Sequence, residues 1–448
     1  MLKYIEYLCN EISRLLKKVS LLGLISFLFY SSVWGQPHSN DTLNSTSASP
    51  GSSYFTYDLA YTGEVFSNVA GGIKTGTVYM DNFDLTGTLD TDNAGWWEGG
   101  TFSIYGLGNQ GTAITRYSGD AQGASNIEAV NSWRIYEAWY QHIFFDLKAS
   151  VLVGLYDLNS EFDRNRSGSL FLNSSHGIGA AYGNSGVTGP SIFPLTSLGI
   201  RVKAMPANRF TIKAAVLDGV PADQNDPRGT TINLDPDEGY LGAFELKWLF
   251  GSLCSEGYMK QRHRLTNYLN RKPVIDAALE FSIGAWAYSK KQETFASRIP
   301  NSPPSNKAYE AGIYALLDWF CLPLDTHNGQ RRGLSLFLRG GWANAAASRW
   351  NYYLGTGFSL NGFLPNRPDD ELGLALAMPF QSSSYRDWRE SMDNLKTTPA
   401  ETNIEATYAA NITGWLSLKA DLQYIINPGA TQRYDNSLVI GGRVIISN

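Results

Sequence analysis

Charged side chains recur in this sequence on alternate positions of otherwise apolar stretches. In GLSLFLRGGW, residues 333–342, Leu334, Leu336 and Leu338 fall on one parity and Arg339 falls on the other. A β-strand of this kind has one apolar face and one face that carries charge. Such a charged face must meet water or other polar groups, because guanidinium, ammonium and carboxylate groups need hydrogen-bonding partners.

The same parity argument selects ten candidate residues for contact with a solute. Each lies on the polar side of an alternating stretch, and the tryptophan among them offers a flat ring on which a ring-shaped solute can stack. The set is Arg201, Lys203, Lys213, Glu245, Glu280, Trp286, Arg339, Lys419, Asp421 and Arg443. The competing interpretation is that each residue only faces water, on a channel wall or on an ordinary protein surface, and binds no solute.

Alternation with a period of two continues through most of the chain and predicts the elements that carry these residues. It is clear in the stretches 210–217, 351–363, 371–378 and 416–424. Runs of about 8–10 alternating residues are typical of strands, and turn-forming clusters such as TDNAG and LPNRPDD separate them. At about 25 residues for each strand and its connection, the chain after residue 35 has room for about sixteen strands.

Two features favour a membrane barrel over a soluble sheet. Aromatic residues end several apolar rows, as Trp248, Trp342, Tyr352 and Tyr424 do, and barrels carry such rings at the membrane interfaces. A lysine or arginine facing lipid at mid-membrane costs about 2–4 kcal/mol, so the charged faces must meet water. A solvent-facing surface remains the alternative. No stretch after residue 36 approaches 18 consecutive apolar residues, which argues against membrane-spanning helices.

The first 35 residues have a composition of their own. A basic, polar start is followed by the apolar run VSLLGLISFLFY and by small residues, which is the pattern of a secretory signal peptide. We expect cleavage between Gly35 and Gln36, with an uncleaved anchor as the alternative. Residues 36–53, rich in Ser, Thr and Asn, are predicted to be a flexible linker, and residues 54–448 the barrel domain.

Other chemistry has little support in the sequence. Cys254 and Cys321 could pair in an oxidising compartment, but two unrelated thiols are an equal expectation. The basic stretch 251–273 is interpreted as a solvated loop, with an extracellular loop that binds anionic surface sugars as the alternative. The formal charge of −5 gives no reason to expect nucleic-acid binding. Hydrolase, zinc-protease and phosphate-loop motifs are absent, and the five His are scattered, so we predict neither an enzyme nor a metal or other cofactor.

Several phrases, taken in order, resemble the carbohydrate-selective porin family of the OprB type from about residue 54 to the C-terminus. They include YTGEVFSNVAGGIKTGTVYMDNFDL (61–85), WRIYEAWYQ (133–141), GPSIFPLTSLGIRVK (189–203), RGLSLFLRGGWA (332–343) and WLSLKADLQYIINPG (415–429). The resemblance implies an all-β protein, a transmembrane antiparallel β-barrel of sixteen strands in the outer membrane. Small sugars would diffuse passively through a water-filled lumen narrowed by inward-folded loops, which we place at 163–194.

The expected partners are small sugars, outer-membrane lipid and the barrel-assembly machinery, and the sequence leaves the oligomeric state open, with a homotrimer as one candidate. One departure concerns the last residue, which is usually aromatic in such barrels and is Asn448 here. Two other functions stay open. One is a secreted soluble β-protein that binds or hydrolyses carbohydrate, and the other is an outer-membrane adhesin barrel with a closed lumen.

Overall fold

The computed structural model describes residues 53–145, 148–223, 228–232, 234–251, 278–300, 306–327, 330–393 and 395–448. The chain divides into two units, Met1–Ser47 and Ala48–Asn448, and every described residue belongs to the second. The expected signal peptide and all of the linker except its last residue lie outside the described ranges, so both stay predictions.

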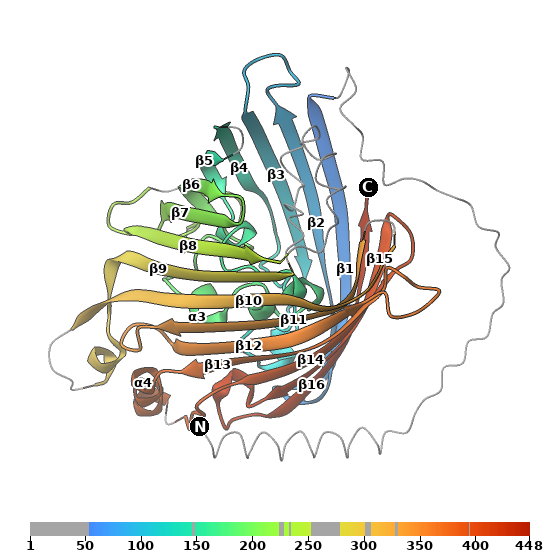
Figure 1. The fold of residues 1–448 in the computed structure, drawn as a ribbon. Helices are drawn as coiled ribbons and strands as arrows, with labels where there is room; N and C mark the ends of the chain where they lie inside the picture. Colours follow the sequence, from blue (N-terminus) through green and yellow to red (C-terminus); the bar gives the residue numbers. More distant parts are fainter. Residues whose placement is uncertain are drawn as a thin grey trace. The chain divides into compact units, whose positions relative to one another are not determined.

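Sixteen antiparallel strands form one closed barrel, in which each strand pairs with its neighbours in sequence and β1 pairs with β16 (Figure 1). The strands are β1 (Phe55–Gly72), β2 (Gly76–Asp90), β3 (Gly100–Gly111), β4 (Ser132–Phe144), β5 (Ala149–Tyr156), β6 (Ser197–Ala207), β7 (Phe210–Asp218), β8 (Tyr240–Phe250), β9 (Leu279–Glu293), β10 (Lys307–His327), β11 (Gln330–Ala343), β12 (Trp350–Asn361), β13 (Glu371–Gln381), β14 (Thr402–Asn411), β15 (Leu416–Ile426) and β16 (Asp435–Ser447). The predicted fold class and strand number are confirmed.

The alternation of the sequence corresponds to the two faces of the barrel wall. Leu336, Leu338 and Trp342 of β11 point outward and are exposed, whereas Phe337 and Arg339 point inward and are buried. Arg339 lies opposite Gly355 of β12. A Cβ atom on Gly355 would lie 3.0 Å from Cγ of Arg339, so glycine leaves room for the arginine stem.

Aromatic rings gather at strand ends on the outer surface, as the sequence predicts. The Trp248 ring of β8 lies between Phe210 of β7 and Phe281 of β9, with ring centroids 5.1 and 5.8 Å away. These residues lie where β7 begins, β8 ends and β9 begins, which is one end of the barrel. Rings at this level fit the interfacial belt of a membrane barrel.

The C-terminal residue closes the barrel although it is not aromatic. The backbone N–H of Leu59 in β1 donates to Oδ1 of Asn448 at 2.7 Å. The backbone N–H of Asn448 in turn donates to the Leu59 carbonyl at 3.2 Å. Asn448 therefore continues the β1–β16 pairing beyond the last strand residue.

Short helices lie in the connections between strands. They are α2 (Thr115–Ser118), α3 (Ala180–Gly183), α4 (Ser383–Asp393), η1 (Leu158–Ser160), η2 (Ser167–Leu170), η3 (Ser174–His176), η5 (Phe295–Arg298) and η6 (Pro428–Ala430). Within the part of the chain that the structure describes, no helix is long and apolar enough to span a bilayer.

The two barrel ends have different connections. The chain enters β1 and leaves β16 at the end of the barrel where residues 208–209 and 412–415 form short connections, which we call the turn end. The long connections 112–131 and 157–196 lie at the opposite end, the loop end. In outer-membrane barrels short turns face the periplasm and long loops the outside. The basic stretch 251–273 lies outside the described residues except for Gly251.

Candidate functional site

The connection between β5 and β6, residues 157–196, is folded into the barrel, and we call it the inward loop. Its apolar side chains are buried, among them Leu158, Phe162, Phe171 and Tyr182. Local caps shape its single helical turns: Asp157 accepts a hydrogen bond from the Asn159 N–H at 2.8 Å. The prediction that 163–194 folds inward is confirmed, and the loop begins slightly earlier than expected.

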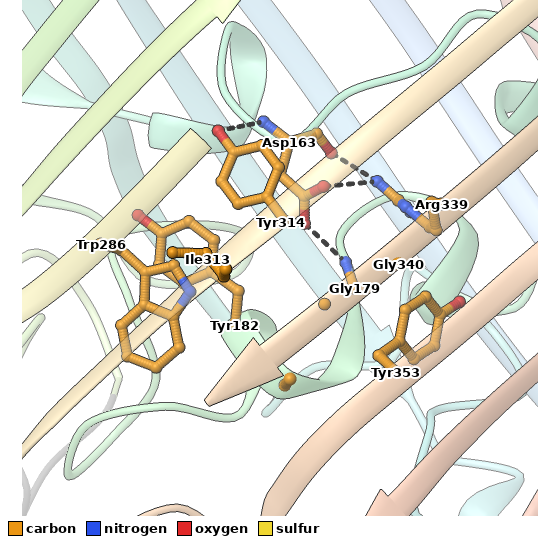
Figure 2. Close-up of a pocket in the computed structure, with 11 residues that line it drawn as sticks. Asp163, Gly179, Tyr182, Trp286, Ile313, Tyr314, Arg339, Gly340 and Tyr353 are labelled. Atoms are coloured by element: carbon orange, nitrogen blue, oxygen red, sulfur yellow. Dashed lines mark hydrogen bonds and ion pairs between the residues drawn. The ribbon is translucent and has the colours of Figure 1, made fainter. Parts of the chain in front are cut away.

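Arg339 holds the backbone of the inward loop. One terminal nitrogen, Nη1, donates to the carbonyls of Ser175 and His176 at 2.9 and 2.8 Å. The other, Nη2, donates to the carbonyl of Asp163 at 2.6 Å and to its carboxylate at 3.1 Å (Figure 2). Only 1% of Arg339 is exposed. Its guanidinium is therefore committed to the loop and does not face an open channel.

Asp163 connects the inward loop to several strands through hydrogen bonds. Its other carboxylate oxygen accepts a hydrogen bond from the Gly179 N–H at 2.9 Å. Its own N–H donates to Glu245 of β8 at 3.0 Å and to the Tyr314 hydroxyl of β10 at 3.2 Å. The Tyr314 hydroxyl donates to Glu245 at 2.8 Å, and Nζ of Lys213 in β7 lies 2.6 Å from the same carboxylate. A buried network thus fixes this part of the loop.

Aromatic packing secures the same region. Tyr182 of α3 stacks on Trp286 of β9, with ring centroids 4.9 Å apart and planes 3° from parallel (Figure 2). Between these rings, Tyr353 of β12 and Arg339 remains a cavity of about 10 Å³, close to the size of one water molecule. Tyr182 therefore covers the face of the Trp286 ring that we expected to contact a solute.

Glu161 ties the start of the loop to β6. Its carboxylate lies 2.6 Å from Nε of Arg201 and 3.3 Å from Nζ of Lys203. Lys213 also donates to the Glu161 carbonyl. Burial alone would raise the pKa of Glu161, but Lys203, Arg201 and Lys213 outweigh burial and lower this pKa to about 2. Glu161 is therefore ionised at neutral pH.

The middle of the loop reaches the far wall. Asp318 of β10 accepts hydrogen bonds from the N–H groups of Arg166 and Ser167 at 2.9 and 2.7 Å. Nζ of Lys419 in β15 donates to the Leu170 carbonyl at 2.8 Å. Glu405 of β14 accepts from the Leu172 N–H. The loop thus extends from β6 across the lumen to β15.

His176 lies in an apolar part of this contact. Its ring lies 5.0 Å from that of Phe171 and 5.8 Å from that of Phe337, measured between centroids. Burial, helped by the charge of Arg339, lowers the pKa of His176 to about 3. The imidazole is therefore neutral at physiological pH, so it packs as a ring and adds no charge.

A second connection, residues 112–131 between β3 and β4, also contacts the interior, and we call it the second loop. Its Ser125 hydroxyl donates to Glu64 of β1 at 2.6 Å, and Arg443 of β16 donates to the Asn126 side chain. The two loops touch, because the Asn126 N–H donates to the Leu172 carbonyl at 2.7 Å. We did not expect this loop to fold inward, since it is shorter than the first and rich in turn-forming residues.

The ten predicted residues all point into the barrel, but they differ in exposure. Seven are buried: Arg201, Lys213, Glu245, Trp286, Arg339, Asp421 and Arg443. Lys203, Glu280 and Lys419 are partly exposed. Asp421 accepts hydrogen bonds from the Thr407 hydroxyl at 2.6 Å and the Gln423 amide at 2.8 Å. Glu280 lies 3.0 Å from Arg166 of the loop and 3.6 Å from Lys247 of β8.

Parity could not assign Arg134 and Glu137, and the structure gives the reason. A β-bulge in β4 leaves Tyr136 without a partner in β3, since Tyr105 pairs with Glu137 and Gly106 pairs with Ile135. Arg134 is buried and bonds the Ser132 hydroxyl at 3.1 Å, while its Nη1 has no partner among the described residues. The Glu137 carboxylate accepts from the N–H of Asp157, at the start of the inward loop, at 2.9 Å.

The thiol of Cys321 in β10 lies 3.4 Å from the Leu334 carbonyl. Cys254 lies outside the described residues. A disulfide between the two therefore stays a prediction.

Comparisons with known proteins agree with this geometry. The family model of the carbohydrate-selective porin, OprB family, matches residues 74–447. Porin B of Pseudomonas aeruginosa is 23% identical over 422 residues, or 87% of each chain. The high-pH structure of Pseudomonas putida OprB has a TM-score of 0.75 at 19% identity and covers 88% of this chain and 94% of that chain. Its low-pH structure has a TM-score of 0.52 at 18% identity, covering 88% and 92%.

Proposed function

Because the chain belongs to the carbohydrate-selective porin family of the OprB type, we propose that small sugars diffuse through its lumen past a fixed inward loop. The protein is an outer-membrane β-barrel porin, and its transport is passive. A fixed loop limits the size of the solute that can pass, whereas a mobile loop would give the channel no constant cross-section. The observation that carries this proposal is the set of hydrogen bonds from Arg339 to three loop carbonyl groups and the Asp163 carboxylate.

The predicted residues then separate into two roles. The buried group acts on the loop and on the wall: Arg201, Lys213, Glu245, Trp286, Arg339, Asp421 and Arg443 are anchors or neighbours of anchors. Lys203, Glu280 and Lys419 keep water-accessible surface inside the barrel and are our candidates for contact with a passing sugar. Charged groups offer the sugar hydroxyls both donors and acceptors of hydrogen bonds. Because these groups also bind other protein groups, their affinity for sugar stays low enough for the sugar to be released.

Arg134 differs from the second group, because it is buried. Its Nη1 has no protein partner in the described part of the chain, in contrast to Nη1 of Arg339, and that atom is itself buried. A buried N–H group without a partner is unfavourable, so an enclosed water would complete it. We therefore do not count Arg134 among the residues that contact a passing sugar.

The proposal extends to partners and to chemistry. The barrel-assembly machinery would insert the chain, using a C-terminal strand that ends in Asn448 rather than in an aromatic residue. Membrane lipid would surround the wall, and the active form would be a homotrimer. The protein would act as a channel without catalysing a reaction.

Swelling of liposomes that contain the purified protein tests the proposal. We expect iso-osmotic glucose to enter at a rate above that of empty liposomes, and a larger neutral sugar such as maltoheptaose to enter more slowly. Lys203→Gln should slow glucose entry several-fold while leaving the single-channel conductance in salt within about twofold, because it removes a solute contact while Arg201 still pairs with Glu161 of the loop. Absence of glucose entry in the wild type would contradict the porin function and favour a closed adhesin barrel.

A further inference from the structure

Two glycines of the barrel wall lie against the aromatic rings that support the inward loop. In the register of β9 and β10, Gly284 pairs with Tyr314 and Trp286 pairs with Gly312, so each ring has a glycine opposite it on the neighbouring strand. A Cβ atom on Gly284 would lie 2.5 Å from Cε1 of Tyr314, and one on Gly312 would lie 2.7 Å from Cζ2 of Trp286. Both rings therefore occupy space that any other residue type would fill.

The helix α3 of the inward loop packs on these two rings. The Tyr182 ring is stacked on Trp286, and its centroid lies 6.0 Å from that of Tyr314 with the planes 24° apart (Figure 2). The Tyr314 hydroxyl also accepts the hydrogen bond of the Asp163 N–H. The rings thus form a layer between the wall and the loop, and the two glycines allow that layer to lie close to the wall.

This region leaves no spare room for a displaced ring. Trp286 and Tyr314 are only 3% and 5% exposed, and the cavity beside them has a volume of about 10 Å³. Densely packed side chains transmit a displacement to their neighbours. A ring that is pushed away from the wall must therefore push Tyr182 and the rest of α3 toward the lumen.

We propose that Gly284 and Gly312 are positioning residues for size selection, because they set how far the inward loop stands from the wall. Neither glycine contacts a solute. A side chain at either position would lift the ring opposite it, the loop would follow, and the open cross-section of the pore would shrink. The inference rests on the proposed function, since it names the wall residues that define the constriction through which sugar diffuses.

Single-channel conductance and liposome swelling of the full chain test the inference. Gly284→Ala should lower the conductance by about a third and the ratio of maltose entry to glucose entry about threefold, because pore width limits the larger sugar more strongly. The matched control is Gly341→Ala, on the inward face of β11, where a Cβ atom would meet nothing closer than 3.6 Å. This control should keep both values of the wild type.

A double-mutant cycle separates ring displacement from a general loss of stability. Tyr314→Ala removes the ring, so adding Gly284→Ala to it should change neither the conductance nor the entry ratio any further. Heat-modifiable migration on gels shows whether each variant is a folded barrel. If Gly284→Ala alone does not fold, the double variant should fold, because the clash disappears with the ring.

Three results would overturn the inference. They are equal conductance and entry ratio of Gly284→Ala and Gly341→Ala, the same effect of Gly284→Ala with and without the Tyr314 ring, and failure of the double variant to fold. Glucose entry through the wild type distinguishes the two proposals. Wild-type channels that admit glucose while any of these results holds contradict only the role of the glycines, and wild-type channels that admit no glucose contradict the porin function.

Discussion

At the scale of single residues, most of the positively charged side chains inside this barrel bind other protein groups and are not free to contact a solute. The Arg339 guanidinium donates to the carbonyl oxygens of three loop residues and to one carboxylate, all within 3.1 Å. A buried charge is stable only when such partners are fixed around it. Arg339 therefore fixes the loop. The hydrogen bonds to the loop in turn offset the free-energy cost of removing the guanidinium from water.

Arg339→Ala should release the inward loop between Asp163 and Gly179. Leaving Asp163 buried without its partner costs about 3–5 kcal/mol, so the loop detaches while the barrel ladder stays intact. We expect a larger and noisier single-channel conductance in planar bilayers. Arg367→Ala is the matched control, since the Arg367 side chain is 38% exposed and pairs with Asp370, which does not belong to the inward loop. Equal conductance of Arg339→Ala and wild type would contradict the anchoring role.

Glu161 gives a pH-dependent prediction. Its pKa is about 2 in the folded protein and about 4.5 in an unfolded chain, so it stabilises the folded state fully above pH 4.5 and loses that contribution as the pH falls toward 2. Glu161→Gln should therefore lower the thermal unfolding temperature at pH 7, with a difference that shrinks below about pH 4.5. Tryptophan fluorescence during heating in detergent measures it. A difference that stays constant down to pH 2.5 would argue against the ion pairs with Arg201 and Lys203.

At the scale of elements, two connections act together as the constriction. The Ser174 N–H of the inward loop donates to the Gly123 carbonyl of the second loop at 2.9 Å. Gly123 has a positive φ of 76°, and a Cβ atom there would lie 2.7 Å from the Ser174 hydroxyl. Glycine therefore serves both the backbone conformation and the close contact between the loops.

Gly123→Ala should loosen the contact between the two loops and raise the single-channel conductance by a measurable fraction. Gly95→Ala is a matched control, because Gly95 has a similar φ of 72° and a Cβ atom there would meet nothing within 4 Å. Both substitutions carry a left-handed backbone strain of about 1 kcal/mol, so the steric contact alone distinguishes them. Identical conductance of the two variants would show that the loops do not support each other.

The elements also show where sequence reasoning succeeds and where it stops. Alternation predicted β11 and β15 because a wall between lipid and water imposes a strict period of two. The same rule could not place Arg134 and Glu137, because the extra residue of the bulge at Tyr136 shifts the phase by one. A bulge has no reliable signature in a single sequence, although it decides which side chains point inward.

At the scale of the whole molecule, the fold could be predicted from the sequence. Which interior residues anchor the loop and which stay open to solute could not be predicted. Parity placed all ten candidate residues in the interior, yet Arg339 meets partners 163 to 176 residues away in the sequence. Such pairing depends on how an irregular loop folds, and no local sequence pattern predicts that fold. Tyr182, Tyr314 and Asp163 were missed for the same reason, since each gains its role only when the loop meets the wall.

The measurement that tests the central claim most directly is the current through single wild-type channels in a planar bilayer as glucose is added. A sugar pore narrowed by a fixed loop predicts a steady open-channel conductance that falls as the glucose concentration rises, since a sugar in the constriction excludes ions. A conductance that does not change beyond the viscosity effect of glucose, or no channels at all, would contradict it.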